Sequence, residues 1–118
     1  MRKSVLIIEN DPDTMEVLSD VINEMNLNPV CVGEAIDLEL VNSQNPNLIL
    51  LDHWLDETFG ADLCRQLKTS AVTRHIPIIM MSAAPGIEKI AYAAGADAFV
   101  PKPFDLEELC GTINRLIL

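Results

Sequence analysis

Five short apolar runs, separated by longer segments of helical periodicity, constrain the fold of this chain more than any other feature. The runs are rich in leucine and β-branched residues and do not alternate with polar positions; they cover residues 5–8, 30–32, 48–51, 76–81 and 98–100. Continuous apolar character is typical of strands that are covered on both faces, as in a parallel sheet. The runs therefore predict five parallel strands with helices on both sides.

The segments between these runs have the residue spacing of amphipathic helices. In the first segment, Asp11 can cap a helix that has Pro12 at its opening position, and apolar residues follow at steps of three and four. Similar patterns predict four further helices, over 34–43, around 63–67, from 87 to near Gly95, and over 106–117 with Asp105 as its cap. This strict alternation predicts a single α/β domain over residues 1–118, a doubly wound (βα)5 sheet.

Composition restricts the compartment and the partners. The formal net charge of −10 argues against direct nucleic-acid binding, because clustered Lys and Arg hold phosphate backbones. No apolar run approaches the roughly 20 residues that span a bilayer, so we expect a cytoplasmic protein that makes no membrane contact. Cys31, Cys64 and Cys110 lack the spacing of a zinc site and are expected to be reduced thiols at small apolar positions.

Polar and charged residues follow four of the five predicted strands. Glu9 and Asn10 come after the first strand and Asp52 after the third, while Ser82 and Lys102 follow the fourth and the fifth. In doubly wound sheets, ligands bind outside the carboxyl ends of the strands. We therefore expect these five side chains to share one edge of the sheet.

Each of these residues also has a simpler interpretation. Asp11 can serve only as a helix cap, Ser82 as a loop hydroxyl without a role, and Lys102 as a solvated turn residue. Asp52 can satisfy nearby backbone amides at the start of a loop. It is their combination at one edge that points to chemistry.

Clustered carboxylates suit a hard divalent cation with oxygen ligands, and Mg²⁺ is the expected one. A metal in such a cluster neutralises charge on a phosphoryl group while a carboxylate attacks phosphorus and forms an acyl phosphate. Asp52 has the position of that nucleophile, and Lys102 and Ser82 are placed to contact the other phosphoryl oxygens.

Four segments of the chain, taken in order, resemble the receiver domain of two-component response regulators. They are VLIIENDPD, LILLDHWLDETFG, IPIIMMSA and GADAFVPKPF. The resemblance covers essentially the whole chain, and Gly60 falls eight residues after Asp52, as the loop motif of the family requires. The implied fold is the flavodoxin-like receiver fold, which is the same sheet of five parallel strands.

The resemblance implies a role for each residue at the strand ends. Asp52 corresponds to the phosphoacceptor, Ser82 to the switch hydroxyl, Lys102 to the basic partner, and Phe99 to the aromatic whose rotamer responds to phosphorylation. Without the family, Phe99 would be interpreted as core filling. The residues implied to hold Mg²⁺ are Glu9, Asn10, Asp52 and, through its backbone carbonyl, Trp54.

The chain also departs from the family pattern. Asn10 stands where a carboxylate normally contacts the metal, which predicts weaker Mg²⁺ binding, and whether Asp11 or Asp56 compensates stays open. Asp56 itself replaces a usual proline. The stretch 82–95 is about two residues shorter than the common pattern, so the output partner is expected to differ from that of commoner members.

The implied function is a phosphorelay step. A histidine kinase or histidine phosphotransfer protein docks near the first helix and donates its phosphoryl group to Asp52, and the domain catalyses this transfer and its own dephosphorylation. The output partner or fused effector domain is unknown, and a homodimer is an option. The alternative is a degenerate receiver that binds proteins without phosphorylation. A flavodoxin-like or hydrolase enzyme is disfavoured, because the chain has no Gly-rich phosphate loop and no GxSxG elbow.

Overall fold

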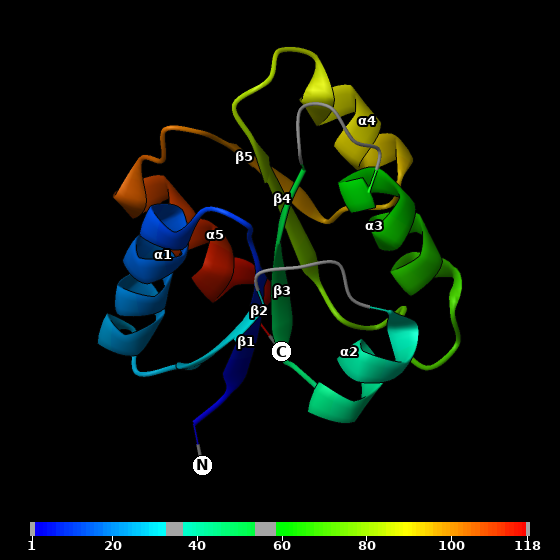
Figure 1. Ribbon diagram of the computed structural model, residues 1–118, viewed down its shortest axis with the longest axis horizontal. Coiled ribbons are helices and arrows are strands. Elements are labelled where there is room, and N and C mark those ends of the chain that lie inside the picture. The colour runs from blue at the N-terminus through cyan, green and yellow to red at the C-terminus, as the bar shows by residue number, and fades with distance from the viewer. Residues whose placement is uncertain (1, 33–36, 54–58, 118) are drawn as a thin grey trace.

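The computed structural model describes residues 2–32, 37–53 and 59–117. Ten elements alternate along the chain (Figure 1): β1 Ser4–Ile8, α1 Pro12–Glu24, β2 Asn28–Val32, α2 Leu38–Gln44, β3 Leu48–Asp52, α3 Phe59–Thr69, β4 Ile78–Ser82, α4 Ile87–Ala93, β5 Ala98–Pro101 and α5 Leu106–Leu116. The strands form one parallel sheet in the order β2-β1-β3-β4-β5. This confirms the predicted doubly wound α/β fold.

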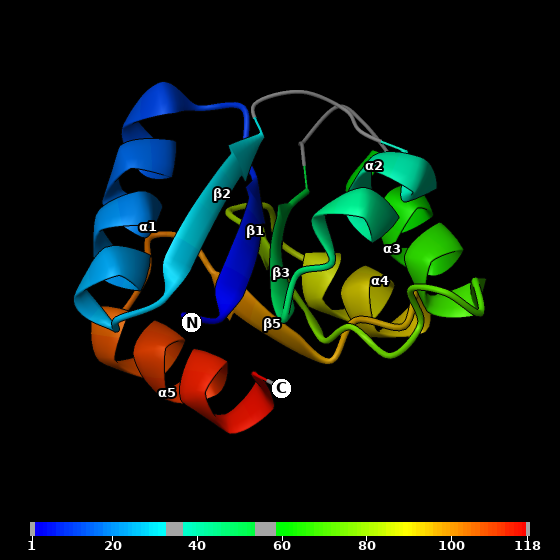
Figure 2. The ribbon, with the colours of Figure 1, turned by 90° about the horizontal axis from the view of Figure 1, so that it is seen from below.

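Helices cover both faces of the sheet. Helices α1 and α5 lie on one face, and α2, α3 and α4 lie on the other (Figure 2). Alternate residues of β1 enter opposite layers: Val5 and Ile7 pack with residues of α1 and α5, while Leu6 and Ile8 pack with residues of α2, α3 and α4. Burial on both faces is the physical reason for the continuous apolar runs in the sequence.

Two helix starts follow their predicted caps. The side chain of Asp11 accepts from the backbone N–H of Thr14, and that of Asp105 accepts from the N–H groups of Glu107 and Glu108. The second helix begins at Leu38, later than the predicted position 34, although residues 34–36 are outside the described ranges. No helix in the described ranges is both long and apolar enough to cross a bilayer.

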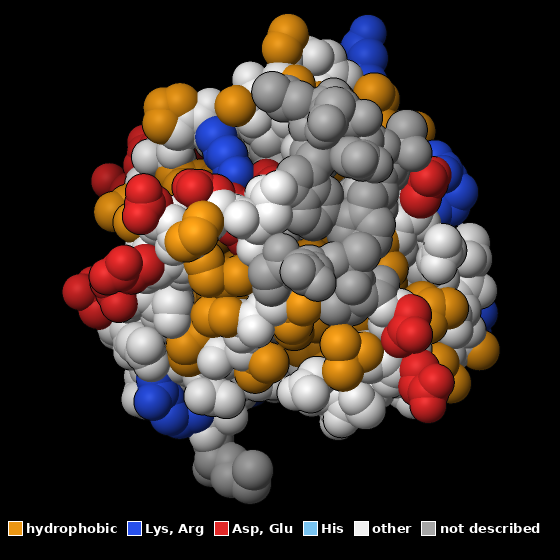
Figure 3. Space-filling model, viewed as in Figure 1, with side chains coloured by type: hydrophobic (Ala, Val, Ile, Leu, Met, Phe, Trp, Pro, Cys, Tyr) orange, Lys and Arg blue, Asp and Glu red, His pale blue; other side chains and the backbone are white. Residues whose placement is uncertain are grey.

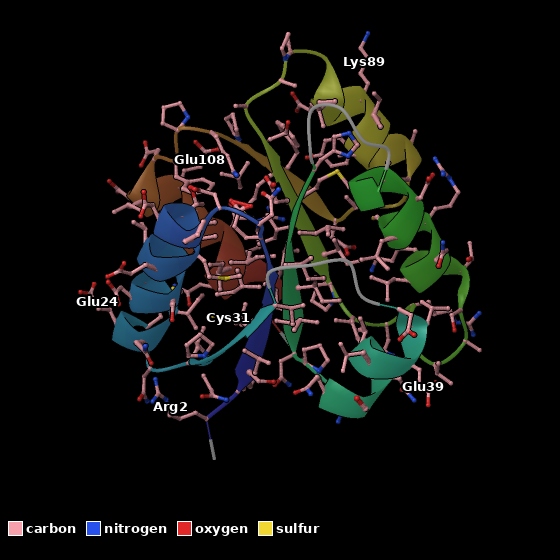
Figure 4. All side chains as sticks on the ribbon, viewed as in Figure 1. Arg2, Glu24, Cys31, Glu39, Lys89 and Glu108 are labelled. Atoms are coloured by element: carbon pink, nitrogen blue, oxygen red, sulfur yellow. The ribbon has the colours of Figure 1, made fainter. Side chains whose placement is uncertain are left out.

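The sequence pattern was also wrong in other details, and the second strand begins at Asn28, two residues earlier than predicted. The fourth strand begins at Ile78, two residues later than predicted, because pairing with β3 starts there. Cys31 does not fill an apolar position: it is exposed on β2, at the edge of the sheet (Figure 4), whereas Cys64 is buried and Cys110 is half-buried. All three are free thiols, as expected.

An ion pair ties helix α3 to the starts of β4 and β5. Lys68 Nζ lies 2.7 Å from Asp97 Oδ2 and donates to the carbonyl oxygen of Ile76 at 2.8 Å. The same Asp97 oxygen accepts from the backbone N–H of Ile78 at 2.8 Å. These contacts hold the starts of β4 and β5 together, at the end of the sheet opposite the predicted site residues.

Replacing Asp97 with alanine is expected to lower the free energy of unfolding by about 1–3 kcal/mol, because it leaves the Ile78 amide and the Lys68 ammonium without this acceptor. Urea unfolding followed by far-UV circular dichroism measures the change. Asp20→Ala, at an exposed position of α1, is the matched control and is expected to change stability by less than about 0.5 kcal/mol. Equal stability of the two variants would contradict the role assigned to Asp97.

Candidate functional site

The predicted site residues lie at the carboxyl edge of the sheet. Asp52 and Ser82 are the last residues of β3 and β4, and Glu9 and Lys102 directly follow β1 and β5. These strands run in one direction, and β1, β3, β4 and β5 are consecutive neighbours. Parallel pairing therefore brings together residues that are as much as 93 positions apart in the sequence.

Lys102 joins the two carboxylates of this edge. Its Nζ lies 2.7 Å from Oε1 of Glu9 and 2.7 Å from Oδ1 of Asp52. The side chains of Glu9 and Asp52 are 0% and 7% exposed, and that of Lys102 is 20% exposed. Lys102 is therefore a partly buried counter-ion and not a solvated turn residue.

Burial and mutual contact shift the ionisation of this cluster. Desolvation, followed by the hydrogen bond with Asp52, raises the pKa of Glu9 to about 7, although Lys102 acts in the opposite direction. For Lys102, burial lowers the pKa, but the contacts with Asp52 and Glu9 outweigh it and the net direction is upward. Lys102 is therefore a stable ammonium group at neutral pH.

Ser82 and Phe99 occupy the neighbouring strands β4 and β5. Ser82 is buried, and its Oγ accepts from the backbone N–H of Ala84 at 3.0 Å in the turn after the strand. Phe99 pairs in register with Met80 and packs, half-buried, against the layer formed by α2, α3 and α4. Ser82 is the last residue of β4, and Phe99 lies two residues before the end of β5.

The remaining candidate residues do not join this buried cluster in the described part of the chain. Asn10 is exposed, in contrast to its buried neighbour Glu9. Asp11 is engaged as a helix cap, with Oδ2 accepting from the N–H and the hydroxyl of Thr14 at 3.0 and 2.6 Å, which favours the simpler interpretation of this residue. Trp54 and Asp56 lie outside the described residues.

A hollow of about 270 Å³ opens beside Lys102, between α1 and the segment that leads into α5. Apart from Lys102, its lining consists of Asp13, Thr14, Val17, Pro103 and Phe104. Acidic side chains gather nearby, over α1 and the start of α5 on the left of the view (Figure 3). Sequence reasoning missed this hollow, because its two sides are joined only by the fold.

Gly60, at the start of α3, packs directly behind Asp52. A Cβ atom at this position would lie 2.9 Å from the Cα of His53 and 3.0 Å from the carbonyl oxygen of Asp52. Contacts this short involve backbone, which does not move aside easily. The glycine is therefore needed for the close approach of α3 to the end of β3.

Gly60→Ala is expected to destabilise the fold by about 1–3 kcal/mol, because the added methyl group overpacks this contact. Gly111→Ala in α5 is the matched control: its Cβ would meet nothing within 4 Å, so it is expected to stabilise by about 0.5–1 kcal/mol. Thermal unfolding of both variants measures the difference. A Gly60→Ala variant as stable as the unmodified protein would show that the approach is looser than described.

The comparisons with known proteins agree with this architecture. The family model of the response regulator receiver domain matches residues 5–114. The chain belongs to the response-regulator receiver family. This places it in two-component signalling, and its sheet, with the acidic edge described above, is the receiver fold.

Two curated relatives cover almost the whole receiver chain. The polar-differentiation response regulator DivK of Brucella ovis is 30% identical over 120 residues, which span 99% of this chain and 98% of DivK. The DNA-binding response regulator MtrA of Mycolicibacterium smegmatis is 30% identical over 117 residues, which span 97% of this chain but only 50% of MtrA. Receiver domains of this type therefore occur both alone and joined to further sequence.

Solved structures show the same fold. A response-regulator structure from Chloroflexus aurantiacus J-10-fl has a TM-score of 0.89 at 23% identity, with 98% of each chain covered. The receiver domain of the sensor histidine kinase PA1611 from Pseudomonas aeruginosa PAO1 has a TM-score of 0.86 at 23% identity, again with 98% of each chain covered. The latter is described with a magnesium ion coordinated in its active-site cleft.

One feature of this receiver domain suits a divalent cation: a buried carboxylate oxygen that has no hydrogen-bond partner. Oε2 of Glu9 is a buried oxygen with no hydrogen-bond partner, beside a second buried carboxylate, Asp52. The described residues contain no group of three or more acidic, His or Cys side chains that could hold a metal. The available oxygen donors are thus two carboxylates and, next to Glu9 in sequence, the amide of Asn10.

Proposed function

We propose that this receiver domain accepts a phosphoryl group on Asp52, in a reaction that requires Mg²⁺, and that the modification switches its surface. The observation that carries the proposal is the cluster of Asp52, Glu9 and Lys102, with both ion-pair distances at 2.7 Å. A buried carboxylate beside a fixed cation is suited to accept a group that brings additional negative charge. The donor is a phosphohistidine on a histidine kinase or a histidine phosphotransfer protein.

In the transfer, a carboxylate oxygen of Asp52 forms a bond to phosphorus as the bond between phosphorus and the donor imidazole nitrogen breaks. The electron pair of that bond returns to the imidazole, which is then free to take up a proton. Bound Mg²⁺ supplies charge neutralisation at the phosphoryl oxygens. Lys102, already in contact with Asp52, stays close enough to pair with another of these oxygens.

The change at Asp52 is proposed to reach the surface through Ser82 and Phe99. The phosphoryl oxygens offer the O–H of Ser82 a charged acceptor, whereas Ser82 Oγ itself accepts from the backbone N–H of Ala84 at 3.0 Å. Movement of this hydroxyl and its turn frees space that Phe99 can enter. The result is a population shift between two arrangements of α4, β5 and α5.

The hollow beside Lys102 supports a docking place for the donor near α1. Val17 contributes an apolar side chain that is 47% exposed, and Phe104 and Pro103 add apolar surface on the other side. A donor protein seated there would present its imidazole next to Lys102. The acidic surroundings favour a donor with basic residues around its histidine.

The test is phosphorylation by a small acyl phosphate, followed by intact mass spectrometry. In the presence of Mg²⁺ the protein is expected to gain the mass of one phosphoryl group, and with EDTA it is expected to gain none. The modification should be lost on treatment with hydroxylamine, as expected for an acyl phosphate. No gain of mass with Mg²⁺ would exclude the proposal.

A second candidate is a degenerate receiver that binds its partner without phosphorylation. The exposed, uncharged Asn10 favours it, because the position normally provides a metal-contacting carboxylate. Titration with Mg²⁺ separates the two functions, with the fluorescence of Trp54, the single tryptophan, as the readout. A saturable change supports the phosphoacceptor, and its absence supports the degenerate receiver.

A further inference from the structure

His53 directly follows Asp52 and is a buried residue that the proposed mechanism does not use. It is 6% exposed, and its Nδ1 atom is buried without a hydrogen-bond partner in the described part of the chain. A Cβ atom placed on Gly60 would lie 3.0 Å from this nitrogen, so Nδ1 faces the first turn of α3, where glycine offers no side chain to bind it. Because buried polar atoms are hydrogen-bonded in the great majority of cases, a partner for this nitrogen is expected nearby.

Ser82 is the neighbour of His53 on the next strand. The backbone N–H of His53 donates to the carbonyl oxygen of Met81 at 2.9 Å, which extends the parallel pairing of β3 and β4 by one residue and sets His53 beside Ser82. Leu51 and Met80, two positions earlier on the two strands, pack in the layer formed by α2, α3 and α4. Because side chains alternate between the faces of a sheet, His53 and Ser82 lie on that same face.

The hydroxyl group of Ser82 complements this nitrogen. Ser82 is 2% exposed, and its Oγ accepts from the backbone N–H of Ala84, while no hydrogen bond donated by its O–H is found among the described residues. A neutral imidazole with its proton on Nε2 has an acceptor at Nδ1. Neighbouring strands lie about 4.8 Å apart, a separation that a serine hydroxyl and an imidazole ring can bridge with one hydrogen bond.

We infer that His53 is a positioning residue for the switch: in the unphosphorylated protein its Nδ1 accepts a hydrogen bond from the Ser82 hydroxyl, which donates to a phosphoryl oxygen instead once Asp52 is phosphorylated. The ring reaches the hydroxyl by rotation about χ2, a broad and roughly two-fold torsion in histidine, which turns Nδ1 away from Gly60. Oγ keeps its bond from Ala84, because a hydroxyl donates and accepts at the same time. The inference rests on the proposed function and deepens it, since it names what holds the switch hydroxyl before phosphorylation.

This hydrogen bond stabilises the unphosphorylated arrangement of the turn after Ser82. The net strength of an ordinary hydrogen bond corresponds to a change of about two- to tenfold in a two-state equilibrium. Without the bond, the arrangement that receives the phosphoryl group is more populated by that factor, and phosphoryl uptake is faster to the same extent.

Phosphoryl uptake by His53→Leu and His53→Asn, from a small acyl phosphate with Mg²⁺, tests the inference. Leucine fills the buried position without an acceptor, so uptake is expected to be about two- to tenfold faster than in the unmodified protein. His53→Asn is the matched control: its Oδ1 keeps an acceptor at the position of Nδ1 along the side chain, and its rate is expected to stay within about twofold. An unchanged or slower rate in His53→Leu, or equal acceleration in His53→Asn, would overturn the inference.

The same substitution in a Ser82→Ala background separates the hydrogen bond from a packing effect of the ring. Ser82→Ala removes the partner of Nδ1, so adding His53→Leu is expected to change the uptake rate by less than about twofold in this background. A packing effect of His53 on α3 would act equally in both backgrounds, and that result would contradict the assigned hydrogen bond.

Heteronuclear NMR of the ring nitrogens measures the bond directly in unphosphorylated, nitrogen-labelled protein. The chain has two histidines, and the exposed His75 serves as the internal control. Ser82→Ala is expected to shift the Nδ1 resonance of His53 and to leave His75 unchanged, because a hydrogen bond polarises the nitrogen that accepts it. A His53 resonance that does not respond to Ser82→Ala would overturn the inference, whatever the stability of the leucine variant.

The outcome is separable from that of the proposed function, since the NMR measurement requires no phosphorylation. Phosphoryl uptake on Asp52, together with a His53 resonance that is independent of Ser82, would overturn the inference and leave the function in place. A Ser82-dependent His53 resonance without any phosphoryl uptake would overturn the function alone.

Discussion

Asp52→Asn is expected to abolish phosphoryl uptake from an acyl phosphate, leaving less than about 1% of the modification seen in the unmodified protein. The amide is a far weaker nucleophile than a carboxylate and cannot form the acyl phosphate. Asp52 is the only carboxylate at the end of β3 among the described residues, and it already contacts Lys102 at 2.7 Å. Intact mass spectrometry in the presence of Mg²⁺ measures the loss.

The fold should survive this substitution. Asparagine has nearly the same shape as aspartate, and Lys102 keeps its contact with Glu9 at 2.7 Å. Far-UV circular dichroism and the urea midpoint provide the control. A variant that is folded and still gains one phosphoryl group would show that another residue is the acceptor, and peptide mapping would then locate it.

Lys102→Met is expected to have the largest effect on stability, about 3–5 kcal/mol at pH 8 without Mg²⁺. The substitution leaves the buried carboxylates of Glu9 and Asp52 next to each other without a cation, and breaking a buried ion pair in this way typically costs this much. Such a loss is a large part of the 5–15 kcal/mol typical of a whole domain. Methionine is unbranched and only one heavy atom shorter than lysine, so the loss reports mainly the missing charge.

Urea unfolding with EDTA, and then with Mg²⁺, measures both parts of this prediction. Mg²⁺ is expected to recover part of the lost stability, because a cation held by Glu9 and Asp52 would offset their negative charge. Lys89→Met is the matched control: Lys89 is exposed and projects from α4 into solvent (Figure 4), and its replacement should change stability by less than about 0.5 kcal/mol. Equal losses of stability at the two positions would show that Lys102 does not stabilise the fold by neutralising Glu9 and Asp52.

Much of the fold could be predicted because its signals are local. Continuous apolar runs revealed β1, β3 and β4, whose residues are nearly all buried, and the capping side chains of Asp11 and Asp105 marked two helix starts. Boundaries were predicted less well. The start of β4 at Ile78 coincides with the start of its pairing with β3 and with the contact from Asp97, and these partners are distant in sequence and leave no pattern in the run itself.

The candidate site, like the fold, has features that follow from local sequence and features that depend on tertiary contacts. The sequence by itself determined which residues follow the strands, since strand ends and residue types are local properties. Only the tertiary structure decided that Lys102 bridges Glu9 and Asp52, because the order β2-β1-β3-β4-β5 places strands together that are far apart along the chain. It also decided that Glu9 is buried with one unpartnered oxygen while Asn10 is exposed, because burial depends on the elements that pack around the end of β1 and not on the two residues themselves.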